Sequence, residues 1–172
     1  MKKVLPLMKK YRVYAILSPI FMILEVIADV VIPFLMAKIV NEGINNRDIE
    51  YIVKVGIAMV IAALLAMFFG VASSHCGARA GHGFASEIRN KTFKKIQGFS
   101  FSNLDDFTVS SLITRLTNDC NTIGQVTMMS LRMGIRAPSM FLFALIMAII
   151  LNPKVAILFA IAIPVMTIAI FI

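Results

Sequence analysis

The sequence predicts an all-α membrane protein with four spanning helices and long helical extensions on the cytoplasmic side. Composition gives the first reason: 59% of the 172 residues are hydrophobic and only 15% are charged, whereas roughly 25% of a soluble domain is charged. Secondly, four apolar stretches approach the roughly 20 residues that a helix needs to cross a bilayer. Thirdly, residues 73–131 are too polar for lipid yet keep helical spacing.

The first two predicted spans are residues 13–39 and 52–72. The first contains two acids, Glu25 and Asp29, and the second has no charged residue from Val55 to Ala72. The segment between them, NEGINNRDIEY, is rich in Asn and Gly, which are typical of turns. We therefore expect a short polar loop between these spans.

The last two predicted spans are residues 132–151 and 155–172. Only Asn152, Pro153 and Lys154 separate them, and so short a connection between two helices forces an antiparallel hairpin. The domain boundaries expected from this pattern are a cytoplasmic N-terminus at 1–12 and a membrane domain at 13–172.

The distribution of basic residues predicts the orientation. Of the 17 Lys and Arg residues, five lie in residues 1–12, six in residues 73–131 and two at the start of the third span. Because cytoplasmic flanks of membrane helices collect Lys and Arg, the N-terminus and residues 73–131 are expected in the cytoplasm of a multi-pass cell-membrane protein. The same reading explains the net charge of +8 without a nucleic-acid partner.

Residues 73–131 are expected to form two helical stalks. Apolar positions recur at helical spacing on both halves, which predicts that the second span continues as a helix to about Gln97 and that another helix begins near Ser110. The predicted contact positions are Ala80, Phe84, Ile88, Thr92 and Ile96, then Val109, Leu112, Ile113, Leu116, Cys120, Ile123 and Thr127.

The segment between the stalks predicts a short helix that docks on a soluble partner. Gly98 is a candidate C-cap for the first stalk, and Ser102 or Asn103 is a candidate N-cap for the short helix. Leu104 and Phe107, three residues apart, share one face. Asp105 and Asp106 fall in the first turn, where the helix dipole favours acids.

Several segments resemble the transmembrane domain of ATP-binding cassette (ABC) exporters of the bacterial multidrug half-transporter type. They include LEVIADVVIPFLMAKIVNEGI, FASEIRNKTFKKIQGFSF, SSLITRLTNDCNTI and LRMGIRAPSMFLFALIMAIILNPKVA. The chain is most similar to the subfamily that often forms heterodimers. The resemblance implies a type-1 exporter fold in which six helices precede a nucleotide-binding domain and two half-transporters, identical or different, assemble in lipid.

The resemblance also implies a function and a set of roles. Residues Ser102, Asn103, Leu104, Asp105, Asp106 and Phe107 would form a coupling helix that contacts a nucleotide-binding domain. ATP and Mg would act in the full-length transporter, and ATP-driven closure would drive alternating access and efflux of a multidrug or lipid-like, hydrophobic or cationic substrate. Because G-x-x-x-x-G-K-[ST] does not occur in these 172 residues, we expect the nucleotide-binding domain to be absent from them. No catalytic, cofactor-binding or metal-binding residue is predicted here.

Glu25 and Asp29 are the main intramembrane candidates because acids at that depth cost several kcal/mol unless they are paired or hydrated. One hypothesis is a cavity wall that attracts cations, or a proton-linked site. The other is a structural pair satisfied by neighbouring helices, including Arg136. On the stalks, Arg89, Arg115 and Asp119 are expected to make structural contacts.

Two other functions remain open from the sequence. The intramembrane acids would also suit a secondary transporter or channel, and a truncated chain would have no transport activity. The long stalks favour the exporter, since secondary carriers usually have short connections between spans.

Overall fold

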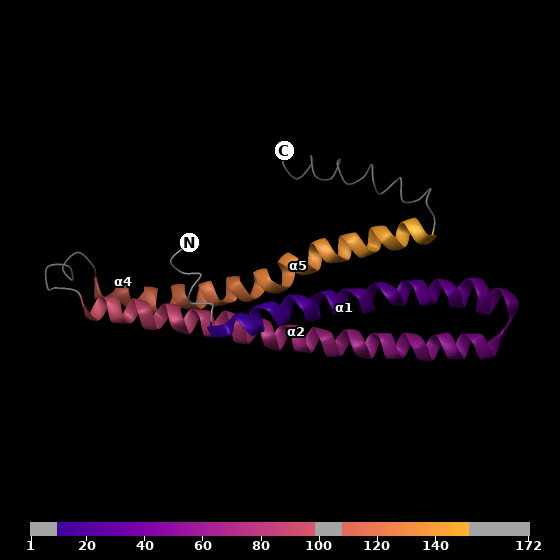
Figure 1. Cartoon of the computed structure of the whole chain (residues 1–172), viewed down its shortest axis with the longest axis horizontal. Coiled ribbons are helices and arrows are strands. Elements are labelled where there is room, and N and C mark those ends of the chain that lie inside the picture. Colours follow the sequence, from indigo (N-terminus) through magenta and orange to yellow (C-terminus); the bar gives the residue numbers. More distant parts are fainter. Residues whose placement is uncertain (1–9, 99–107, 152–172) are drawn as a thin grey trace, which may run out of the picture. The chain divides into compact units, whose positions relative to one another are not determined.

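The structure, a computed structural model, describes residues 10–98 and 108–151. Their regular structure is entirely helical, in the order α1 (Arg12–Lys38), η2 (Ile39–Ile44), α2 (Ile49–Gln97), α4 (Val109–Thr114), η3 (Arg115–Asp119) and α5 (Cys120–Leu151) (Figure 1). Among the described residues, three helical runs are long and apolar enough to cross a membrane: Arg12–Ile44, Ile49–Gln97 and Val109–Ile150. The all-helical prediction is confirmed, while the predicted fourth span, residues 155–172, lies outside the described residues.

The chain divides into two compact units. We call residues 1–22 and 70–135 the stalk unit, and residues 23–69 and 136–172 the span unit. Helices α1, α2 and α5 each contribute residues to both units. The helix α2 alone has 49 residues, which at 1.5 Å per residue gives a length of about 73 Å. A bilayer core is only about 30 Å thick, so α2 extends well beyond what a membrane crossing needs.

The ends of the stalk helices agree with the prediction. Helix α2 ends at Gln97, and the backbone N–H of Gly98 donates to the carbonyl of Lys95 at 3.2 Å. Helix α4 begins at Val109, where Thr108 is the N-cap and its hydroxyl accepts from the backbone N–H of Ser111. A β-region residue whose hydroxyl accepts this bond is a typical N-cap.

The predicted polar loop between the first two spans is largely helical, which corrects that prediction. Residues Ile39–Ile44 form the π-helix η2, and the chain turns through Arg47, whose φ of 55° is left-handed. The Asp48 carboxylate then accepts from the backbone N–H of Tyr51 at 3.0 Å and caps α2. The Tyr51 hydroxyl donates to Glu42 across the turn at 2.5 Å. These side-chain hydrogen bonds hold the two helix ends together, so the connection is shorter than the predicted loop.

Most apolar side chains of α2 in the span unit are exposed within this chain. A soluble domain of this size does not leave so large a contiguous apolar surface uncovered. Lipid or further membrane helices are the surroundings in which such a surface is stable. The exposed residues include Ile57, Val60, Ile61, Leu64, Leu65, Met67 and Phe68.

Candidate functional site

The stalk unit has a narrow core that runs along α2 and the α4–η3–α5 run. Ala80 and Phe84 are buried on α2, as predicted, and Ile88, Thr92 and Ile96 are half-buried on the same side. On the facing run, Leu112 and Cys120 are buried, whereas Val109, Ile113 and Ile123 are exposed, which corrects the prediction for these three. Leu112, Cys120 and Gly124 are buried, and Leu116, at the same four-residue spacing, is half-buried.

The π-helix η3 accounts for this spacing. Residues Arg115–Asp119 form π turns, in which backbone bonds join residues i and i+5 rather than i and i+4. A π turn contains more residues than an α turn, so positions four apart stay on the same side. The sequence pattern assumed an α-helical spacing throughout and therefore assigned Ile123 instead of Gly124 to the contact face.

The two helices approach most closely at two glycines. A methyl group on Gly81 would lie 2.5 Å from the carbonyl oxygen of Gly124, and one on Gly124 would lie 3.0 Å from the Cβ of Ala85. Only residues without a side chain allow backbones this close. Gly81 and Gly124 therefore fix where the two helices cross.

Arg89 joins the two helices at the π-helix. Its Nε donates to the carbonyl of Leu116 at 2.8 Å, and its Nη2 donates to the side-chain oxygen of Asn121 at 2.8 Å. The Cys120 thiol donates to the carbonyl of Arg115 within the same turn. A guanidinium that donates from two nitrogens fixes orientation as well as distance.

The structure describes the other two predicted stalk residues but not the predicted coupling helix. Arg115 and Asp119 both lie in η3 and are exposed, so the structure places them on the outside of the stalk unit. The candidates Ser102, Asn103, Leu104, Asp105, Asp106 and Phe107 lie outside the described residues.

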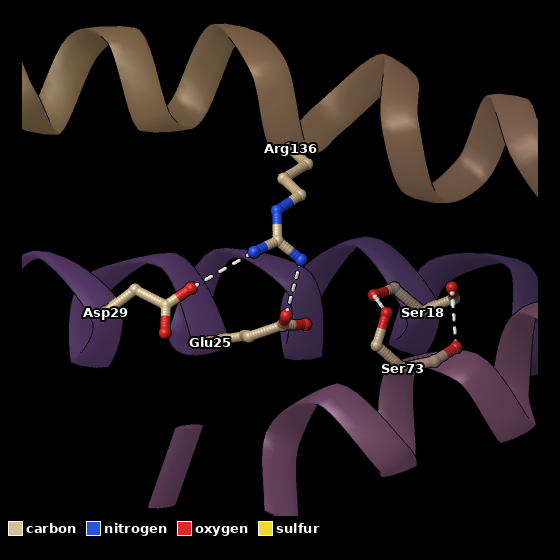
Figure 2. Close-up of polar contacts among 5 residues, drawn as sticks. All are labelled: Ser18, Glu25, Asp29, Ser73 and Arg136. Atoms are coloured by element: carbon tan, nitrogen blue, oxygen red, sulfur yellow. Dashed lines mark hydrogen bonds and ion pairs between the residues drawn. The ribbon is translucent and has the colours of Figure 1, made fainter. Parts of the chain in front are cut away.

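The first turns of α1 pack on α2 through contacts that the sequence analysis missed. Ser18 and Ser73, both fully buried, each donate a hydroxyl hydrogen to the other's backbone carbonyl at 3.0 Å (Figure 2). Arg79 donates to the Tyr14 hydroxyl at 3.1 Å and lies over its ring. The available signal was a serine within an apolar stretch of α1 and another directly after the apolar stretch of α2, since a buried hydroxyl requires a partner.

Lys10, two residues before α1 begins, pairs with Glu87 of α2. Lys10 Nζ lies 3.2 Å from a carboxylate oxygen of Glu87. The hydrogen bond to Glu87, followed by the charge of Glu87, raises the pKa of Lys10 above its ordinary value of 10.5. Because Lys10 is exposed, this pair contributes little to stability.

In the span unit, Arg136 bridges the two predicted intramembrane acids. Its Nη1 lies 2.7 Å from Glu25 Oε1, and its Nη2 lies 3.2 Å from Asp29 Oδ2 (Figure 2). The acids are one turn apart on α1, so a single guanidinium from α5 reaches both. We call Glu25, Asp29 and Arg136 the charged triad.

The three members of the triad differ in exposure. The Glu25 side chain is 10% exposed, that of Asp29 32% and that of Arg136 41%. Glu25 Oε2 is buried and has no hydrogen-bond partner among the described residues. The guanidinium therefore satisfies one oxygen of each acid and leaves the second oxygen of Glu25 unsatisfied.

A family profile for the ABC transporter transmembrane region matches residues 15–172. The chain belongs to this family. Three apolar helices and the pairing of α2 with the α4–η3–α5 run agree with a transporter membrane domain. Membership implies a transport role and an ATP-binding partner domain.

Three curated relatives are similar over nearly the whole chain. The uncharacterized ABC transporter ATP-binding protein YfiB of Bacillus subtilis is 32% identical over 166 residues, which are 96% of this chain and 29% of that relative. The uncharacterized ABC transporter ATP-binding protein MT1311 of Mycobacterium tuberculosis is 28% identical over 161 residues, which are 94% of this chain and 28% of that relative. The ATP-dependent lipid A-core flippase of Pseudoalteromonas translucida is 25% identical over 164 residues, which are 95% of this chain and 28% of that relative. The chain thus spans less than a third of each relative's length.

Proposed function

We propose that this chain forms the N-terminal part of the membrane domain of an ATP-driven exporter of the bacterial multidrug half-transporter type. The full transporter would couple closure of two nucleotide-binding domains, with ATP and Mg, to alternating access. The partner would be a second half-transporter, either an identical chain or a related, different one. Its substrate would be a hydrophobic, cationic or lipid-like small molecule, and the flippase among the relatives supports the lipid-like class.

The pairing of the two helices beyond the spans carries this proposal. Helix α2 runs on to Gln97, and the Gly81–Gly124 crossing and the Arg89 hydrogen bonds join it to the returning helix. Two helices joined at two places move together rather than bending separately. Such a pair would transmit a movement of the nucleotide-binding domains to the spans. A secondary carrier or channel has no nucleotide-binding domain and does not need such a connection.

The orientation and the docking element follow from the sequence. Thirteen basic residues favour a cytoplasmic location for the N-terminus and for the stalks. We assign docking to Ser102–Phe107, because in a helix there Leu104 and Phe107 would share one face and Asp105 and Asp106 would fall in the first turn.

Cysteine crosslinking in the full-length transporter tests the proposal. With native cysteines removed, Asp105→Cys is expected to crosslink to a cysteine on the surface of the nucleotide-binding domain. ATP is expected to change the yield, since docking geometry changes with nucleotide state. Arg47→Cys, at the turn between α1 and α2, is the matched control and should not crosslink.

Two readouts complete this test. The reconstituted transporter should move lipid-like or cationic dyes only with hydrolysable ATP. Crosslinking of Arg47→Cys but not Asp105→Cys to the nucleotide-binding domain would reverse the orientation, and ATP-independent transport driven by an ion gradient would favour a secondary carrier. The structure gives that second function less support, because Arg136 already pairs with both acids.

A further inference from the structure

The part of the stalk unit next to the spans carries an excess of positive charge. Residues 10–22, 70–86 and 120–135 contain no Asp or Glu, but they contain four basic residues: Lys10, Arg12, Arg79 and Arg132. Such an excess attracts anionic partners, and beside membrane-spanning helices these are the headgroups of anionic lipids. We propose that Arg79, with His75 one turn away on α2, binds the phosphate of an anionic phospholipid.

The length of α2 places Arg79 at the level of the headgroups. No charged residue lies between Lys54 and Arg79, and at 1.5 Å per residue the helix between them measures about 37 Å. A hydrocarbon core is about 30 Å thick, and a bilayer with its headgroups about 40–45 Å. A crossing with Lys54 in one headgroup layer therefore has Arg79 in the other. Helix α1 has the same design, since Arg12 and Lys38 at its ends lie about 39 Å apart.

Tyr14 of α1 orients the Arg79 guanidinium. Arg79 Nη1 donates to the Tyr14 hydroxyl at 3.1 Å, and the guanidinium carbon lies 5.4 Å from the centre of the ring. A guanidinium has five N–H donors, and this bond takes one of them. Arg79 is exposed, and guanidinium groups bind phosphate oxygens through two N–H groups at once. The contact therefore holds an accessible phosphate-binding group at the membrane surface, where tyrosine is also enriched.

The surface beside Arg79 fits a lipid better than a soluble phosphate. Val71, His75 and Arg79 are all exposed and follow one another at four-residue intervals on α2, so they share one face. The Val71 side chain is 65% exposed and lies on the membrane side of Arg79, about 12 Å away along the helix. A phospholipid matches this order with an acyl chain against Val71 and its phosphate at Arg79. The His75 imidazole lies between the two and has an N–H donor for the phosphate or ester oxygens.

The other three cations are less suited to this contact. Lys10 already pairs with Glu87 at 3.2 Å. The Nε of Arg132 is buried, so this nitrogen is closed to a headgroup. Arg12 is exposed and adds its charge to the same layer from α1. Arg79 is therefore the cation that combines exposure with an orientation fixed by an aromatic partner.

This inference rests on the proposed function only for the choice of leaflet. With the stalks in the cytoplasm, the site lies in the cytoplasmic leaflet. Lipid binding requires the folded membrane domain but neither ATP nor transport. Because Arg79 of α2 is bonded to Tyr14 of α1, a lipid bound there is expected to stabilise the contact between the two helices.

Native mass spectrometry of the full-length transporter, titrated with phosphatidylglycerol in detergent, tests the site. The wild type is expected to bind phosphatidylglycerol more tightly than phosphatidylcholine with the same acyl chains. Arg79→Gln should lower the association constant for phosphatidylglycerol about fivefold, the effect of one basic residue near a membrane surface, and leave that for phosphatidylcholine unchanged. Lys91→Gln, which removes the same charge from an exposed position farther along α2, is the matched control and should leave both constants unchanged.

Tyr14→Phe adds a second criterion and serves alone where Arg79→Gln does not fold. It keeps the guanidinium but removes the acceptor that orients it, so phosphatidylglycerol binding should weaken by a smaller factor. Equal binding of the two lipids by the wild type, equal losses in Arg79→Gln and Lys91→Gln, or displacement of the lipid by soluble glycerol phosphate would overturn the site. Such a result would leave the exporter proposal intact, because the titration needs no ATP. Conversely, a transporter that fails to move substrate with ATP would still bind the lipid.

Discussion

Arg89 and Leu116 are joined by a hydrogen bond of 2.8 Å from the guanidinium Nε to a backbone carbonyl. The acceptor lies inside the π-helix Arg115–Asp119, where the regular α-helical bonding is interrupted. Arg89 therefore holds α2 to the one segment of the facing helix whose backbone departs from the α pattern. This bond fixes the axial register of the two helices.

Replacing Arg89 is expected to weaken coupling more than folding. Arg89→Lys keeps the charge but not the two-nitrogen geometry, so the transported substrate per ATP hydrolysed should fall several-fold. Because Arg89 is exposed, the cost in stability should be only about 1 kcal/mol. Parallel assays of ATP hydrolysis and dye transport in proteoliposomes measure the ratio. Lys91→Gln, on an exposed neighbouring position, is the control, and an unchanged ratio in Arg89→Lys would contradict the prediction.

The helix crossing predicts opposite effects for two pairs of glycines. Gly81→Ala should destabilise the protein by about 1–3 kcal/mol, because the added methyl would lie 2.5 Å from the Gly124 carbonyl oxygen, and Gly124→Ala should cost less, because its methyl would meet the Ala85 Cβ at 3.0 Å. Gly56→Ala and Gly134→Ala, which meet no atom within 4 Å, should be neutral or stabilising by up to about 1 kcal/mol. Thermal unfolding of the purified transporter compares the four variants. Equal effects in both pairs would mean that the helices do not cross closely.

Removal of Arg136 alone should be more damaging than removal of the whole triad. Arg136→Gln leaves two acids without their partner, a change that costs about 3–5 kcal/mol for a buried pair; the partial exposure of Asp29 and Arg136 places the expected loss at the low end. The triple variant Glu25→Gln, Asp29→Asn, Arg136→Gln has no charge to compensate and should recover most of that loss. Unfolding in detergent of the two variants and the wild type gives the comparison. A triple variant less stable than Arg136→Gln would contradict the role of charge pairing.

The Lys10–Glu87 pair predicts a stability contribution that depends on pH and salt. Because the folded-state pKa of Lys10 is raised above 10.5, its contribution is fully present below pH 10.5 and is lost as the pH rises through the folded value. The contribution should also decrease with added salt. Melting temperatures of wild type and Lys10→Gln, measured from pH 8 to pH 11.5, should converge at the high end. A difference that persists there would point to packing of the lysine stem instead.

The sequence was sufficient for the features that depend on composition and local pattern. The apolar stretches predict the long helices, and the stalk boundary at Gln97 agrees because Gly98 follows a continuous helical pattern. The π-helix was not predictable, since a change from α to π bonding leaves no distinct residue signature, and it moved the contact face from Ile123 to Gly124. The turn near Arg47 is shorter than expected because Asp48, Tyr51 and Glu42 make contacts that composition does not encode.

At the candidate site, too, the sequence predicted which residues lie on one side of a helix but not which atoms bond. The spacing of Glu25 and Asp29 places both on one side of α1, but it does not specify that one guanidinium bonds to a single oxygen of each. That asymmetry depends on the position of α5, as does the unsatisfied Glu25 Oε2. Pairwise geometry between helices distant in sequence is set by packing, so residues such as Tyr14 and Arg79 gave no local signal.

Ser18 and Ser73 exchange hydrogen bonds with each other's backbone and are fully buried. Each hydroxyl thus has its acceptor without recourse to solvent or to a third side chain. These two hydrogen bonds between α1 and α2 therefore do not depend on whether lipid or water surrounds them. The beginning of α1 is thereby held directly to the part of α2 that lies in the stalk unit.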